Sequence, residues 1–141
     1  MLQIVYFCEE DGKSSMKDYL DGLIQSADDL EAQGKTKRAG QMRNLAFRLL
    51  SIIRHAAEHE GIVHPPLGDK MHAYPFFELR QRHGKRLIRI FYFAYHKEKL
   101  VLLHMYEKNE GESARQGEME QANRNYKTYI SNPEKYEIIH L

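Results

Sequence analysis

The segment Tyr74–Lys108 reads YPFFELRQRHGKRLIRIFYFAYHKEKLVLLHMYEK and contains three strand-like runs joined by two short connections. Strands are expected at about Pro75–Arg82, Arg86–Tyr95 and Lys99–Lys108. Arginines and one histidine are interspersed among otherwise apolar residues in these runs. Because an unpaired charge is costly to bury, the pattern indicates that one face of the sheet does more than pack.

The rest of the chain supplies one strand and three helices. Leu2–Phe7 is rich in Ile, Val, Tyr and Phe, which is typical of a strand. Apolar residues at three- and four-residue spacing predict helices at Ser15–Leu30, Thr36–Glu60 and Ser113–Ile130. The order β-α-α-β-β-β-α predicts an α+β fold, with a mostly antiparallel four-stranded sheet, an N-terminal helical hairpin on one face and a C-terminal helix. Tyr136–Leu141 gives no clear pattern.

Side chains alternate across a strand, so the lengths of the two connections decide which residues share a face. Two-residue connections at Gly84 and near Lys97 gather the polar side chains on one face: Arg80, Arg89, His104, Tyr106 and Lys108. The opposite face is then almost wholly apolar and suits two amphipathic helices: Phe77, Leu79, Ile88, Ile90, Tyr92, Val101, Leu103 and Met105. The polar face also has an apolar half, which the last helix or a protein partner is expected to cover: Leu87, Phe91, Phe93, Leu100 and Leu102.

Charge is unevenly distributed although the formal net charge of the 141 residues is only +1. Residues 72–108 carry +5, whereas residues 1–71 and 109–141 each carry −2. This favours an anionic partner for the strand segment. The lone Cys8, the lack of a long apolar run and an acidic stretch after the first strand predict a cytoplasmic protein without membrane contact.

Three blocks, in this order and at this spacing, resemble the RelE/ParE toxin superfamily and, within it, the HigB-like, phage-type branch: FFELR (Phe76–Arg80), RLIRIFYF (Arg86–Phe93) and LLHMYEK (Leu102–Lys108). The resemblance implies a single RelE-like toxin domain over residues 1–141, acting in a type II toxin–antitoxin pair. HigB-like and RelE-like members are ribosome-dependent mRNA endonucleases, whereas ParE-like members poison DNA gyrase. The implied partners are an antitoxin of helix-turn-helix type and mRNA on the ribosome, and no cofactor is implied.

By the same resemblance, five residues are expected to be catalytic: Arg80, Arg89, His104, Tyr106 and Lys108. Three more are expected to bind substrate: Arg82, Lys85 and Arg86. Metal-free RNA cleavage needs a base for the 2′-hydroxyl, a cation beside the phosphorane and an acid for the leaving 5′-oxygen. The forked donors of the arginines suit the phosphate. His104 or Lys108 would be the base, and His104 or Tyr106 the acid.

Structural and non-catalytic alternatives stay open. The arginines would have a plain structural role if they pair with Glu78, Glu98 or Glu107 on a solvated sheet. The chain would be a binding protein if it is a ParE-like gyrase poison or an inactive toxin relative. A toxic nuclease must be neutralised by tight binding to its antitoxin, and an exposed apolar patch around Phe91, Phe93 and Leu102 is the candidate contact.

The stretch His55-Ala-Ala-Glu58-His59 has the H-x-x-E-H order of some zinc enzymes. Both histidines fall away from the apolar stripe of their helix, and no third ligand follows in an obvious place. We therefore expect no metal site there.

Overall fold

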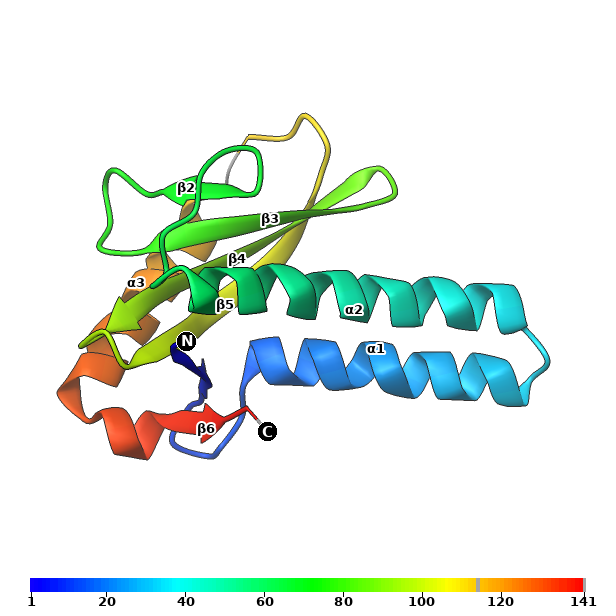
Figure 1. The fold of residues 1–141 in the computed structure, drawn as a ribbon, viewed down its shortest axis with the longest axis horizontal. Helices are drawn as coiled ribbons and strands as arrows, with labels where there is room; N and C mark the ends of the chain where they lie inside the picture. Colours follow the sequence, from blue (N-terminus) through cyan, green and yellow to red (C-terminus); the bar gives the residue numbers. More distant parts are fainter. Residues whose placement is uncertain (114, 141) are drawn as a thin grey trace.

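The computed structural model describes residues 1–113 and 115–140 and shows the predicted α+β fold (Figure 1). The strand β1 (Gln3–Phe7) leads into an antiparallel hairpin of two helices, α1 (Ser15–Ala32) and α2 (Thr36–Glu58). Four strands follow: β2 (Gly68–Lys70), β3 (Phe77–His83), β4 (Arg86–Tyr95) and β5 (Lys99–Asn109). The chain continues through α3 (Gln116–Ser131), a 3₁₀ turn η1 (Pro133–Tyr136) and β6 (Glu137–Ile139).

The sheet has six strands in the order β2-β3-β4-β5-β1-β6, not the four that were predicted. The two additional strands, β2 and β6, have three residues each, which is too short for an alternation pattern to reveal them. β1 runs parallel to β5, and the other pairings are antiparallel. The last helix begins three residues after the predicted start, and Ala114, inside the predicted range, lies outside the described residues.

The two faces of the sheet are covered by different helices. On one face, Leu79, Ile88 and Ile90 pack in one cluster with side chains of the α1–α2 hairpin such as Leu49 and Ile53. On the other face, α3 closes a second cluster that contains Phe91, Phe93, Val101, Leu103, Ala122 and Tyr129. The last helix therefore covers Phe91 and Phe93 of the expected apolar half, whereas Leu100 and Leu102 face the helical hairpin instead.

The apolar patch that was predicted as an antitoxin contact is not exposed. Phe91 and Phe93 are buried on the α3 side, and Leu102 is buried on the hairpin side. The prediction is wrong because α3 and the hairpin already occupy the space that it left for a partner.

The β4–β5 hairpin differs from the predicted register. Next to its turn, Tyr95 pairs with Lys99, so three residues lie between the strands where two were predicted. His96 and Lys97 hold left-handed backbone angles in this turn, with φ of 50° and 56°, without a glycine. Leu100 and Leu102 consequently face the helical hairpin, and Val101 and Leu103 face α3, the reverse of the prediction.

A β-bulge restores the predicted register further along. The pairing shifts between Phe91 and Tyr92, and Leu103 is the extra residue of β5. Beyond it, Phe91 pairs with His104 and Arg89 with Tyr106, as the two-residue connection required. Among the described helices, none is long and apolar enough to cross a bilayer.

Candidate functional site

Pairing across β3, β4 and β5 aligns the predicted catalytic residues in rows on the α3 side of the sheet. The central row is Arg80, Arg89 and Tyr106. The rows on either side of it are Glu78, Phe91 and His104, and Arg82, Leu87 and Lys108. Directly paired residues of antiparallel strands lie on the same face, with Cβ atoms about 5 Å apart. All five residues predicted to be catalytic therefore share one face.

Glu78 lies between two of the arginines and is only 1% exposed. One of its carboxylate oxygens accepts hydrogen bonds from Arg80 Nε at 2.7 Å and Arg80 Nη2 at 2.6 Å. The other oxygen pairs with Arg89 Nη2. Sequence reasoning named Glu78 only as a possible partner of these arginines. The signal that it could have used is the E-x-R spacing, which puts Glu78 and Arg80 on the same side of β3.

Arg89 is buried, with 7% of its surface exposed. Its Nη1 donates to the Tyr106 hydroxyl at 2.9 Å, and its Cζ lies 5.8 Å from the ring centroids of both Phe91 and Tyr106. The sheet face is therefore closed to solvent around Arg89, although Arg80 in the same row is partly exposed. The physical reason is that the ion pair with Glu78 and the flanking aromatic rings allow a guanidinium to be buried.

Arg80 differs from Arg89 in its access to solvent. Its side chain is 34% exposed. A guanidinium carries five N–H donors, and Glu78 takes one at Nε and one at Nη2. The remaining donors of Arg80 are the part of the arginine pair that can reach an anion from outside.

Lys108 and Arg82 lie at the open end of the same face, beyond the central row. Lys108 Nζ donates to the carbonyl oxygen of Glu112 at 2.7 Å, which ties the end of β5 to the loop that follows it. Arg82 is exposed and pairs with Glu110 of the same loop. Both cations have acidic or carbonyl partners that a stronger anionic ligand would have to displace.

Lys85 and Arg86 do not join this group. Lys85 is exposed at the β3–β4 turn, and Arg86 points to the hairpin side of the sheet, where its Nε donates to Glu107 at 2.8 Å. Glu107 also accepts a hydrogen bond from Tyr19 of α1. Burial raises the pKa of the Glu107 carboxyl, but the hydrogen bonds from Tyr19 and Arg86 outweigh it and hold the pKa below its usual range.

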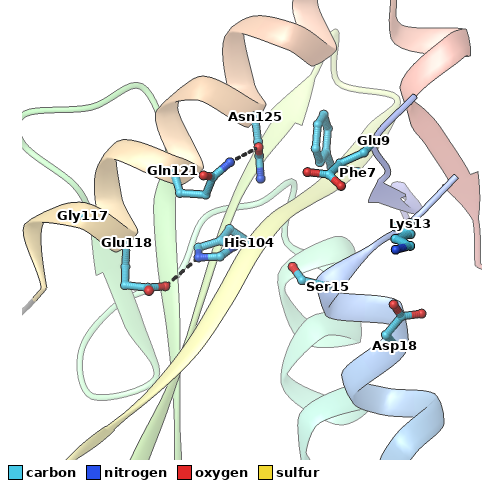
Figure 2. A pocket seen from close by; sticks show the side chains of 10 residues that line it. All are labelled: Phe7, Glu9, Lys13, Ser15, Asp18, His104, Gly117, Glu118, Gln121 and Asn125. Carbon is cyan, nitrogen blue, oxygen red and sulfur yellow. Dashed lines mark hydrogen bonds and ion pairs between the residues drawn. The ribbon is translucent and has the colours of Figure 1, made fainter. Parts of the chain in front are cut away.

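His104 lines a cleft of about 500 Å³ between α3 and the segment that joins β1 to α1 (Figure 2). Its Nε2 lies 2.7 Å from a carboxylate oxygen of Glu118, which comes from the first turns of α3. Figure 2 shows the two side chains pointing toward each other, with Gln121 further along the same helix. The opposite wall of the cleft comes from the end of β1, the β1–α1 segment and the start of α1: Phe7, Glu9, Lys13, Ser15 and Asp18.

The charged groups that line the cleft do not favour an anionic ligand. Three carboxylates line it, from Glu9, Asp18 and Glu118, against the single ammonium of Lys13 and the imidazole of His104. His104 therefore lies between two environments. It is on the same sheet face as the arginine row, but its ring contacts the carboxylate of Glu118 in the wall of the cleft.

The H-x-x-E-H stretch lies on the exposed side of α2 near its end. The rings of His55 and His59 stack with centroids 4.1 Å apart, and His59 Nδ1 lies 2.8 Å from the His55 carbonyl oxygen. In the described part of the chain, no three or more His, Cys, Asp or Glu side chains form a group that could hold a metal ion.

Residues 41–127 match the family of phage-derived Gp49-like proteins (DUF891). The chain belongs to this family. The matched part of this Gp49-like protein runs from α2 into α3 and contains all of β3, β4 and β5, and therefore every residue of the rows described above. Membership of a phage-derived family agrees with the phage-type, RelE/HigB-like resemblance of the strands. No curated protein and no solved structure matches the chain.

Proposed function

We propose that this Gp49-like protein is the toxin of a type II toxin–antitoxin pair and that it cleaves mRNA on the ribosome without a metal ion. The observation that carries the proposal is the row Arg80, Arg89 and Tyr106, flanked on the same face by His104 and Lys108. Family membership supports the toxin part of the proposal, and the row of cations and proton-transfer groups supports the chemistry.

Arg80 is the residue proposed to bind the phosphate. Glu78 takes only part of the N–H donors of Arg80, and the Arg80 side chain is partly exposed, so the rest of the guanidinium could bind two phosphate oxygens. Arg89 acts behind it, because its buried guanidinium orients Glu78 and the Tyr106 hydroxyl. The positive charge of this row would stabilise the extra negative charge of the phosphorane transition state.

The groups proposed to transfer protons are His104 and Lys108, which lie on either side of the row. His104 and Lys108 are four residues apart on β5, which is about 13 Å along a strand. A phosphate held over Arg80 and Tyr106 would lie between them, so one group can take the 2′-hydroxyl proton while the other protonates the leaving oxygen. Glu118 orients the His104 ring through its hydrogen bond.

The test is cleavage in a translation extract, with mapping of new mRNA ends. Arg80→Ala and His104→Ala should each lower the cleavage rate by about 100-fold. Arg124→Ala, which changes an exposed arginine on α3 away from the rows, should cleave at the parent rate. Cleavage should persist in EDTA when polyamines keep the ribosomes intact. Parent-like cleavage by both site variants would show that the site lies elsewhere.

A second candidate function is a non-catalytic binding protein, such as a ParE-like gyrase poison or an inactive toxin relative. Glu78 favours it, because one buried carboxylate already engages both arginines. Growth arrest without new mRNA ends, or loss of gyrase supercoiling in a purified assay, would support this candidate against the endonuclease.

An endonuclease toxin and a gyrase poison both require a protein antitoxin, since a toxin must be neutralised in its own host. Co-expression with a small helix-turn-helix protein from a neighbouring gene should restore growth and yield a stable complex. Unhindered growth of cells that express this chain alone would argue against both kinds of toxin.

A further inference from the structure

The row of Arg80, Arg89 and Tyr106 continues onto the start of α3. The row crosses from β3 to β5, and Arg115, the residue just before the first turn of α3, contacts its last member. Arg115 Cζ lies 5.8 Å from the centroid of the Tyr106 ring. Its main-chain nitrogen lies 3.5 Å from the Tyr106 hydroxyl, at the limit of a hydrogen bond. Arg115 is therefore a fourth member of the row, and it was not among the residues that the sequence singled out.

A second contact fixes the start of α3 over the sheet. Gln116 Nε2 donates to the hydroxyl of Tyr74 at 2.7 Å. The Tyr74 ring stacks on Phe76 with centroids 5.2 Å apart, and Phe76 is buried against Phe91. Because Phe91 belongs to the sheet face that carries the row, the position of Arg115 is set by the packing of the sheet and not by the loop alone.

The members of the extended row alternate between support and access. The inner pair is buried, with Arg89 7% and Tyr106 6% exposed. The outer pair is accessible, since the side chains of Arg80 and Arg115 are 34% and 49% exposed. A strand of RNA that crosses the row would therefore contact one guanidinium at each end, with the buried Arg89 between them.

The guanidinium of Arg115 has only a weak partner within the protein. Its Nη2 lies 3.4 Å from Glu112 Oε2, and no other carboxylate in residues 1–113 and 115–140 lies within 4.0 Å of its guanidinium nitrogens. The distance is long for a hydrogen bond, and pairs between exposed side chains contribute little stability. A phosphate accepts two parallel N–H bonds from a guanidinium and is the stronger ligand.

We propose that Arg115 is a second phosphate-binding residue of the site and holds a phosphate next to the one bound by Arg80. The inference takes its ligand, a single-stranded RNA, from the proposed function. Arg115 would bind and not transfer protons, because a guanidinium stays protonated in proteins. A contact to a phosphate that does not react is equally strong in the ground state and the transition state, so it contributes to affinity and not to the maximal rate.

The first test measures binding without cleavage. The probe is a short fluorescein-labelled RNA in which every ribose is 2′-O-methylated, so that it lacks the nucleophile, and fluorescence anisotropy is recorded at several salt concentrations. Arg115→Gln should bind this RNA about 10-fold more weakly, as expected for the loss of one charged hydrogen-bonded contact. Its salt slope should fall by about 0.7, the contribution of one phosphate contact in a single strand.

Two further variants separate a phosphate contact from a structural role. Arg124→Gln removes the same charge from an exposed position further along α3 and should bind like the parent. Arg115→Lys keeps the charge without the fork, so it should retain the salt slope of the parent and most of its affinity. Equal losses in Arg115→Lys and Arg115→Gln would mean that Arg115 acts by packing on the Tyr106 ring, which would overturn the proposal.

The second test measures cleavage in the translation extract as a function of protein concentration. Arg115→Gln should need about 10-fold more protein for half-maximal cleavage and should reach the maximal rate of the parent. If the parent does not cleave but Arg115→Gln still weakens binding, the endonuclease proposal fails and the role of Arg115 stands. If the parent cleaves and Arg115→Gln matches it in affinity and salt slope, the role of Arg115 fails and the endonuclease stands. A parent that does not bind the methylated RNA at low salt, or an equal loss in Arg124→Gln, would also overturn the inference.

Discussion

The carboxylate of Glu78 determines what the two arginines beside it can do. A buried carboxylate is costly unless charged donors surround it, and here Arg80 and Arg89 supply them. The arrangement leaves Arg89 as an internal support and Arg80 as the accessible cation. Because the pair is asymmetric, the two arginines should respond differently to substitution.

Arg89→Ala should lower the free energy of unfolding by about 3–5 kcal/mol, because it leaves the Glu78 carboxylate buried and less compensated. Arg80→Ala should cost about 1 kcal/mol or less, since its side chain is partly exposed and solvent screens the pair. Urea denaturation followed by circular dichroism measures both. A loss below about 1 kcal/mol for Arg89→Ala would contradict the buried network.

Glu107 predicts a dependence of stability on acid pH. Its pKa in the folded protein lies below the ordinary value of 4.5, because hydrogen bonds from Tyr19 and Arg86 outweigh the effect of burial. A depressed folded pKa stabilises the protein above the unfolded pKa, and this contribution is lost as pH falls through the folded value. The difference in unfolding free energy between the parent and Glu107→Gln should therefore shrink from about pH 6 to about pH 3.

The matched control for this pH series is Glu120→Gln, which changes an exposed carboxylate on α3. Its difference from the parent should stay small at every pH. If the Glu107→Gln difference is constant over the same range, then the folded protein does not depress the pKa of that carboxyl.

At the scale of elements, the bulge in β5 joins the sheet to α3. The bulge leaves Leu103 out of the strand pairing, and its carbonyl oxygen instead accepts a hydrogen bond from Asn125 Nδ2 at 2.9 Å. The bulge also places Leu103 and His104 on the same side, so α3 both covers the core and reaches His104 through Glu118. The position of the His104 ring thus depends on how α3 docks.

Asn125→Ala should lower the free energy of unfolding by about 1–3 kcal/mol, because it leaves a buried carbonyl without a donor. Asn123→Ala, on a less buried position of the same helix, should cost about 0.5 kcal/mol or less. Thermal and urea unfolding of the two variants give the comparison. Equal costs would mean that helix propensity, and not the bond to Leu103, accounts for the loss.

The strands were largely predictable because β4 and β5 are rich in β-branched, aromatic and other apolar residues, and the glycine at position 84 marks the connection before β4. The bulge was not predictable from the sequence. In Leu100–Leu103 every side chain is aliphatic, so either register buries apolar groups on both faces. The expected site face survived this error because the turn and the bulge shift the register in compensating directions.

At the scale of the whole molecule, the net charge of a long segment hides the opposite charges of its two helices. The net charge of −2 for residues 1–71 combined an acidic helix with a basic one, so the sequence reading placed positive charge only on the strands. Folding puts the two helices side by side, and just one cation of α2, Arg43, is seen to pair with α1 among the described residues. The opposite charges of the two helices were therefore not recognised from the net charge of the segment.

The hairpin also extends well beyond the sheet, so its far end has only helix–helix contacts to hold it (Figure 1). Ala27 and Ala39 are buried near that end, but small side chains bury little apolar area. Amides near the turn at Gly34 should therefore exchange with solvent through local opening, with little dependence on denaturant. Amides of β4 and β5 should exchange only through global unfolding, with a strong dependence.

Gly40→Ala tests the origin of this local opening. Gly40 lies inside α2, and a Cβ added there meets no atom within 4 Å. Alanine should stabilise the helix by about 0.5–1 kcal/mol, which would slow exchange near the turn by about 2- to 5-fold. Hydrogen exchange with mass spectrometry resolves these segments. If amides near the turn and amides of β5 instead share one exchange free energy and one denaturant dependence, the hairpin opens only with the sheet, and its far end is held by more than the helix–helix contact.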